Sequence, residues 1–255
     1  MSPQPEKDEQ YDSEDEHEYD TDQEEHHDIL GFENAEAMDS VDEAWKHFKH
    51  SGEFYIHNVC LDQSAISHLM RRFTTVESAP KGKYVTKSIE RVEMEACSFV
   101  DDGSTRQWLR FLKMLGKDLK EVFIVGIPNE FLNGDRQISL LRGLQLITPL
   151  ERLAVDRADL RGRSMGLILQ KFLTKSPNLV ELRFNGCRID NHMFLPFLQG
   201  VKSHKGLKRL DLDGWQLNDV ELNLLVDALV ASPSKQTLQC LDISKSKIGV
   251  DSFSG

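Results

Sequence analysis

An apolar frame that recurs along the chain constrains its fold more than any other feature of the sequence. Apolar residues fill positions 1, 4, 6 and 11 of each copy, and in one copy they are Leu150, Leu153, Val155 and Leu160. Further copies begin at residues 179, 207 and 238, so successive copies start 29, 28 and 31 residues apart. A fixed spacing of this size is the signature of a repeat architecture, in which each unit stacks on its neighbours.

Upstream copies extend the same frame towards the N-terminus. The copy that starts at Ile89 fits every position, whereas the copy that starts at Leu119 has Asn129 in place of the last apolar residue. A weaker copy has Ser51 in the first position and apolar residues at 54, 56, 59 and 61. The sequence therefore predicts six repeats, preceded by a seventh that serves as an N-terminal cap.

Each repeat is predicted to contain one strand and one helix. Leu210 and Leu212 alternate as in a strand with one buried face, and apolar residues at 222, 225, 226 and 229 then follow helical spacing. Pro149, Pro177 and Pro233 fall where each helix must end before the next strand. Since no unit can bury its apolar face alone, neighbouring units should stack with parallel strands.

The repeat resembles the ribonuclease-inhibitor-like class of leucine-rich repeats over about residues 50–250. The resemblance implies an α/β fold, a curved solenoid with parallel strands on its concave face and helices on its convex face. After the strand, that class usually has Asn or Cys at the ninth frame position. Cys97 and Cys187 fit, whereas four other copies depart, so we expect irregular turns after some strands; the departures are Ile127, Ala158, Trp215 and Ser246.

The charge distribution separates an acidic tail from a nearly neutral body. Residues 1–28 contain 13 Asp or Glu and one Lys, a sum of −12, so the net charge of −11 leaves about +1 for residues 29–255. We expect the tail to be disordered, either as a solubilising segment or as an acidic docking segment open to phosphorylation. We divide the rest into an N-terminal helical segment with the capping repeat (29–75), a linker (76–88) and the repeats (89–255). The neutral body argues against nucleic-acid binding.

The chain carries no signal of secretion or membrane insertion. It has no apolar run long enough to cross a bilayer and no signal-peptide-like stretch among its first thirty residues. Its four cysteines lack metal-binding or paired spacing. We expect a protein of the cytoplasm or nucleus, without cofactor or metal. Only seven residues follow Ile248, too few for the helix of that repeat, so we expect the sequence to be truncated.

One column of residues between the frame positions is predicted to form a charge ladder. On neighbouring strands it alternates in sign, and its members are Glu53, Arg91, Glu121, Arg152, Glu181, Arg209 and Cys240. Adjacent strands lie about 4.8 Å apart, which places opposite charges side by side. Paired charges are poorly available to a partner, so we interpret this column as structural.

The next two columns supply the candidate partner-binding residues. Towards the C-terminus they gather acids around one arginine and one asparagine, next to an aromatic residue; the set is Asp156, Arg183, Asn185, Asp211, Asp213, Trp215 and Asp242. Unpaired acids beside an aromatic anchor suit another protein with a basic segment. The alternative is a solvated face with a half-buried tryptophan. Tyr55 and Phe123 form a second apolar contact spot, unless the linker covers them.

These features favour a protein-interaction scaffold or adaptor over an enzyme, and they favour no particular oligomeric state. The chain has no glycine-rich phosphate loop and no motif of a serine or zinc hydrolase. Ran GTPase-activating proteins share the repeat class, and a similar role would use loop arginines such as Arg157, Arg161 or Arg188. A substrate receptor of a ubiquitin ligase is a further alternative, although the segment 41–50 is short for a ligase-binding box.

Overall fold

The computed structural model describes residues 35–77, 89–116, 118–126, 140–147 and 149–247 of the chain. Three segments lie outside these ranges: the acidic tail, residues 78–88 of the linker and the last eight residues. The prediction of disorder refers to the tail, and the prediction of truncation refers to the last residues. Helix α2 ends at Glu77, two residues beyond the boundary that the sequence suggested.

A seven-stranded parallel sheet runs through the described chain, in the order β1-β3-β5-β6-β7-β8-β9. The frame residues of neighbouring repeats pair with one another, as in Leu153 with Leu182 and Leu182 with Leu210. The α/β class and the parallel pairing are thus as predicted. The strands are β1 (Phe54–His57), β3 (Arg91–Glu95), β5 (Glu121–Val125), β6 (Arg152–Val155), β7 (Glu181–Arg183), β8 (Arg209–Asp211) and β9 (Cys240–Asp242). A second, two-stranded parallel sheet joins β2 (Cys60–Leu61) to β4 (Ser98–Phe99).

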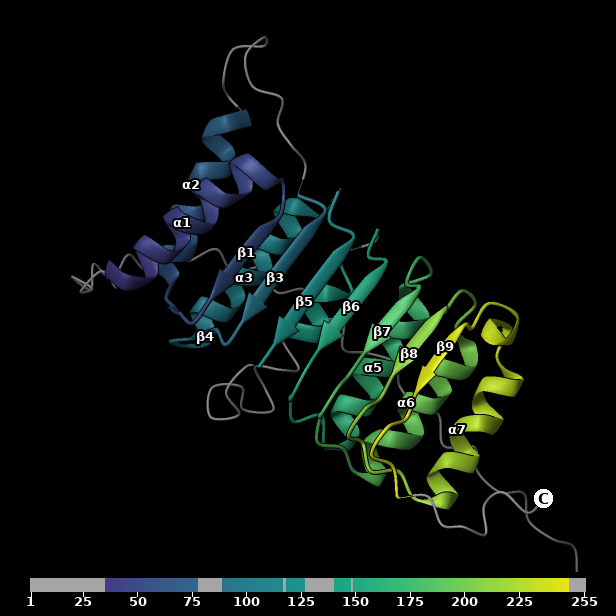
Figure 1. Ribbon diagram of the computed structural model, residues 1–255. Helices are drawn as coiled ribbons and strands as arrows, with labels where there is room; N and C mark the ends of the chain where they lie inside the picture. The colour runs from purple at the N-terminus through teal and green to yellow at the C-terminus, as the bar shows by residue number, and fades with distance from the viewer. Residues whose placement is uncertain (1–34, 78–88, 117, 127–139, 148, 248–255) are drawn as a thin grey trace, which may run out of the picture. The chain divides into compact units, whose positions relative to one another are not determined.

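Helices connect the strands, and α3, α5 and α6 lie together on one face of the main sheet (Figure 1). Alternate strand residues such as Val122 and Ile124 are buried towards these helices. The opposite face, which carries the residues between them, is called the open face below. The helices are α1 (Ala35–Ser51), α2 (Gln63–Glu77), α3 (Asp102–Leu115), α5 (Arg163–Lys175), α6 (Asn191–Ser203) and α7 (Asp219–Ala231), with a short 3₁₀ helix η1 (Pro233–Gln236).

The turns after the main strands share one feature, although they are not identical: the turn after β8 has a second left-handed residue, Gln216, in line with our expectation of irregular turns after some strands. The residue at the eighth frame position adopts a left-handed conformation in every repeat, with φ between 51° and 82°; these residues are Asn58, Ala96, Gly126, Arg157, Gly186, Gly214 and Lys245. The conformation favours glycine, yet four of these positions hold other residues. The recurrence of this conformation therefore comes from the stacking of repeats and not from the preference of the residue at each position.

In three of the repeats, the residue at the ninth frame position links the repeat to the one before it. Three side chains donate a hydrogen bond to the carbonyl of the sixth frame residue in the preceding repeat: Cys97 to Ile56 at 3.4 Å, Cys187 to Val155 at 3.1 Å and Trp215 to Phe184 at 2.7 Å. Burial raises the pKa of the Cys187 thiol to about 12, so the thiol keeps the proton that it donates. Trp215 thus replaces a cysteine at this position, with its indole N–H in the role of the thiol.

A buried polar cluster joins the loops that follow α5, α6 and α7. The His204 ring is 2% exposed, and its Nε2 lies 3.0 Å from the carbonyl oxygen of Ser176. The Gly206 N–H donates to Nδ1 at 3.3 Å, which assigns the proton to Nε2. The His204 carbonyl accepts hydrogen bonds from the hydroxyls of Ser232 and Ser234, both at 2.8 Å. The neutral ring satisfies both neighbours, whereas a protonated ring would leave Nδ1–H facing a donor.

This cluster predicts a pH dependence of stability. Burial lowers the pKa of His204 below its ordinary value of 6.5. As pH falls through about 6.5, the unfolded chain binds a proton that the folded chain refuses, so the free energy of unfolding decreases. His204→Gln keeps an amide donor for the Ser176 carbonyl but does not titrate. Urea unfolding followed from pH 7.5 to 5.5 should show a steeper loss in the parent chain than in this variant; parallel curves would contradict the prediction.

Candidate functional site on the open face of the sheet

The charge ladder that the sequence predicted is present on the open face. Glu121 lies between two arginines, with Arg91 Nη1 at 3.8 Å and Arg152 Nη1 at 2.8 Å from its carboxylate oxygens. Glu181 is likewise flanked by Arg152 Nε at 3.6 Å and Arg209 Nε at 3.7 Å. Since every charge has a neighbour of opposite sign, this column stabilises strand pairing and offers few free groups to a partner.

The predicted cluster of acids around Arg183 is not formed as expected. Arg183 instead pairs with Glu181, two residues earlier on the same strand. Asp211 is 4% exposed and accepts a hydrogen bond from Arg209 Nη2 at 3.2 Å. Residues two apart on a strand share a face, which explains both pairs. Asp211 is therefore a buried member of the charge network, and the interpretation of it as an exposed, unpaired acid was wrong.

The interpretation of Trp215 as an aromatic anchor for a partner was also wrong. It is 4% exposed and packs among Phe184, Phe194 and Phe197, with ring centroids 5.2–6.4 Å away. An aromatic anchor for a partner would have to lie at the surface. Trp215 belongs to the core, where its N–H replaces the thiol described above.

The carboxyl ends of β6, β7 and β8 carry a column of oxygens that lack donors. Asp156, Asn185 and Asp213 occupy equivalent positions just after these strands, and the Oδ1 atom of each is buried with no hydrogen-bond partner. Burial, and after it the charge of Asp211, raises the pKa of Asp156; a hydrogen bond from the Asn185 backbone acts against both. We call Asp156, Asn185 and Asp213 the acceptor column.

Two interactions complete this end of the open face. Lys245 Nζ lies 2.7 Å from the Oδ2 atom of Asp213, so only the other oxygen of that carboxylate lacks a donor. Asp242 accepts from the hydroxyl of Ser244 at 2.6 Å and from its N–H at 2.9 Å, and these bonds lower the pKa of Asp242. Ser244 occupies the same frame column as Asp156, Asn185 and Asp213. Lys245 was missed in the sequence because it lies one residue beyond that column, in the turn.

Tyr55 and Phe123 do not form one apolar spot. In the sheet register Glu93 lies between them, on β3. The Tyr55 hydroxyl donates to Glu95, and that bond raises the pKa of Tyr55 to about 12. Phe123 lies under the guanidinium of Arg91, whose Cζ atom is 4.4 Å from the ring centroid. Both aromatic rings are thus engaged with charged neighbours.

Two of the three loop arginines named for the GTPase-activator alternative lie against neighbouring residues. Arg161 is held by Asp159, with Nε 2.8 Å from its Oδ1 atom, and the Arg157 guanidinium lies against the turn at Gly126. Among the described residues, no group of three or more His, Cys, Asp or Glu side chains is placed to hold a metal ion. In the same part of the chain, every helix is too short or too polar to cross a bilayer.

The chain matches no protein-family model, and no curated protein is significantly similar to it.

Proposed function

We propose that this chain is a protein-binding scaffold built as a leucine-rich-repeat solenoid, with its strands on the concave face and its helices on the convex face. The in-register pairing of frame residues, the recurring left-handed turn and the donors at the ninth frame position support this fold. The strand pairing and these donors link a repeat to its immediate neighbour, as expected when repeats stack in one dimension.

The acceptor column is the observation that carries the binding proposal. A buried oxygen without a donor costs about 1–3 kcal/mol, and the column aligns three of them on neighbouring strands. A hydrogen bond from the Asn185 backbone and the charges of Arg157 and Arg183 offset only part of the burial of Asp156, because its pKa is still raised. These Oδ1 atoms are covered in the free chain, so a partner reaches them only after the side chains rotate. Donors supplied in that bound state would remove the cost, which favours binding from the open face.

Lysine and arginine are the side chains that fit these acceptors. Both are donors without acceptor groups, and charge-assisted hydrogen bonds to carboxylates are about twice as strong as neutral ones. Asp242 lies at the next strand, β9, and extends the negative surface. We therefore propose a basic segment of another protein as the partner, bound across the carboxyl ends of β6–β9.

The test compares proteins captured from cell extract by the full chain and by a variant with Asp156→Asn and Asp213→Asn. Both substitutions keep side-chain shape and remove charge, so the fold should persist while basic partners are lost. We expect their recovery, measured by quantitative mass spectrometry, to fall about tenfold, equivalent to about 1.4 kcal/mol.

The matched control removes two charges elsewhere, with Glu36→Gln and Glu43→Gln on the exposed side of α1. This control should capture the same proteins as the parent chain. Equal recovery by all three baits, or equal loss in both variants, would contradict binding at the acceptor column.

A further inference from the structure

Helix α7 is apolar on nearly all sides. Leu225, Ala228 and Leu229 face the core, yet Val220 is 68% exposed and Val230 60% exposed. Leu224 and Val226 are exposed as well. A surface helix normally presents a polar face to solvent, and a helix that is apolar all round is normally covered. The outer side of α7 therefore has the composition of a buried surface.

A groove separates α7 from α6, and one aromatic residue explains it. The N-terminal caps of α5, α6 and α7 are Gly162, Asp190 and Asn218, 28 residues apart, so Gly166 on α5 corresponds to Phe194 on α6. A Cβ at Gly166 would lie 2.5 Å from the carbonyl oxygen of Met193, which shows how closely α5 and α6 pack. The bulkier Phe194 keeps α7 from approaching α6 in the same way.

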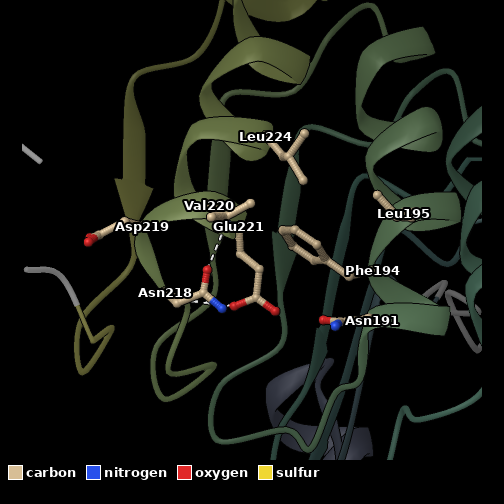
Figure 2. A pocket seen from close by; sticks show the side chains of 8 residues that line it. All are labelled: Asn191, Phe194, Leu195, Asn218, Asp219, Val220, Glu221 and Leu224. Carbon is tan, nitrogen blue, oxygen red and sulfur yellow. Dashed lines mark hydrogen bonds between the residues drawn. The ribbon is translucent and has the colours of Figure 1, made fainter.

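The resulting groove has a volume of about 460 Å³ and combines an apolar wall with an acidic end. Phe194 and Leu195 come from α6, and Val220 and Leu224 from α7 (Figure 2). Figure 2 shows the carboxylate of Glu221 between Asn218 and Asn191, at the polar end. Its Oε2 atom accepts from the Asn218 N–H at 2.9 Å, a bond that holds the carboxylate towards the groove.

The charges around the groove decide which occupant fits. The charged lining residues are Glu221, whose carboxylate lies in the groove, and Asp219, whose side chain points away from it (Figure 2); both are acidic. Helix α7 adds Asp227 and contains no lysine or arginine. If two copies of the chain met through this groove about a two-fold axis, the acidic helix α7 of one copy would face α7 of the other. Like charges that are juxtaposed at an interface are costly. A basic partner gains from the same charges.

We propose that the α6–α7 groove is a second interaction surface, which binds a basic amphipathic helix of a partner protein. Leucine- or phenylalanine-sized side chains of that helix insert between Leu195 and Leu224, and a lysine or arginine lies beside Glu221. This is helix-in-groove recognition, in which apolar anchors give affinity and flanking charges give orientation. Because the groove lies between helices and not on the open face, this inference is independent of the acceptor column.

The test uses two synthetic helical peptides of equal length, with leucine along one face and either lysine or glutamate elsewhere. Fluorescence anisotropy at physiological ionic strength should show saturable binding of the lysine peptide to the full chain and none of the glutamate peptide. Leu195→Lys places a cation in the groove and should weaken binding about tenfold or more. Leu146→Lys alters a residue that is 61% exposed and does not line the groove, and should bind as the parent chain does.

Several outcomes would overturn the proposal. Equal weakening by Leu195→Lys and Leu146→Lys would mean general attraction between charges, and equal binding of the two peptides would remove the charge argument. Loss of binding in the variant with Asp156→Asn and Asp213→Asn would place the peptide on the open face. A dimer of the full chain in light scattering that Leu195→Lys dissociates would make a second copy the occupant. Circular dichroism of each variant checks that it is folded, so that unfolding is not mistaken for loss of binding.

Discussion

Replacement of Trp215 with alanine is expected to lower the free energy of unfolding by about 3–5 kcal/mol, the cost of removing a buried aromatic side chain. The side chain is 4% exposed and packs among the rings of Phe184, Phe194 and Phe197. Its Nε1–H also donates to the Phe184 carbonyl at 2.7 Å, and that acceptor would lose its partner. Urea unfolding, followed by far-ultraviolet circular dichroism, measures the change.

Two controls separate packing from hydrogen bonding at this position. Trp215→Phe keeps an aromatic ring but removes the donor, so we expect a smaller loss of about 1–2 kcal/mol. Leu146→Ala alters a side chain that is 61% exposed and should change stability by less than about 0.5 kcal/mol. If Trp215→Ala cost no more than Leu146→Ala, the tryptophan would lie at the surface, as the sequence alone suggested.

The charge ladder illustrates what the sequence could predict. Once the frame fixes the register of each strand, residues of one column become neighbours, and the alternation of Arg152 with Glu121 and Glu181 follows from geometry. The parallel pairing follows equally, because one strand and one helix per repeat leave no other way to stack. A periodic sequence thus predicts the interactions that repeat with it.

The residues whose exposure was wrongly predicted are those whose environment depends on a neighbour outside their own column. Asp211 is neutralised by Arg209 two positions earlier, a pairing that the strand period of two could have predicted. Trp215 could not be placed in this way. Its burial depends on space beside Phe194 and Phe197, and the frame does not specify the size of that space. The sequence already placed Asp156, Asn185 and Asp213 among the candidate binding residues, but only atomic positions show that their Oδ1 atoms lack donors among the described residues.

Gly166→Leu is expected to destabilise the chain by about 3 kcal/mol, at the upper end of the cost of overpacking. The atoms that a Cβ would meet first are the carbonyl oxygen and the Cα of Met193, at 2.5 and 2.9 Å. Both belong to the backbone of α6, so no side-chain rotation relieves the clash and the helices must separate. Leucine also favours the helix over glycine by roughly 0.8 kcal/mol, which makes the measured loss a lower bound on the steric cost.

The difference between the α5–α6 contact and the α6–α7 contact leads to a second expected effect of the same substitution, which is separation of α5 from α6. Phe194 stands where α5 has Gly166, and the groove lies beside it. Gly166→Leu should therefore widen the α5–α6 contact towards the α6–α7 arrangement, and faster amide hydrogen exchange in both α5 and α6 would report that separation. Gly206→Ala is the matched control, because its Cβ would meet nothing closer than 3.8 Å. If Gly166→Leu were as stable as Gly206→Ala, close packing of α5 on α6 at Gly166 would not explain why a groove separates α6 from α7.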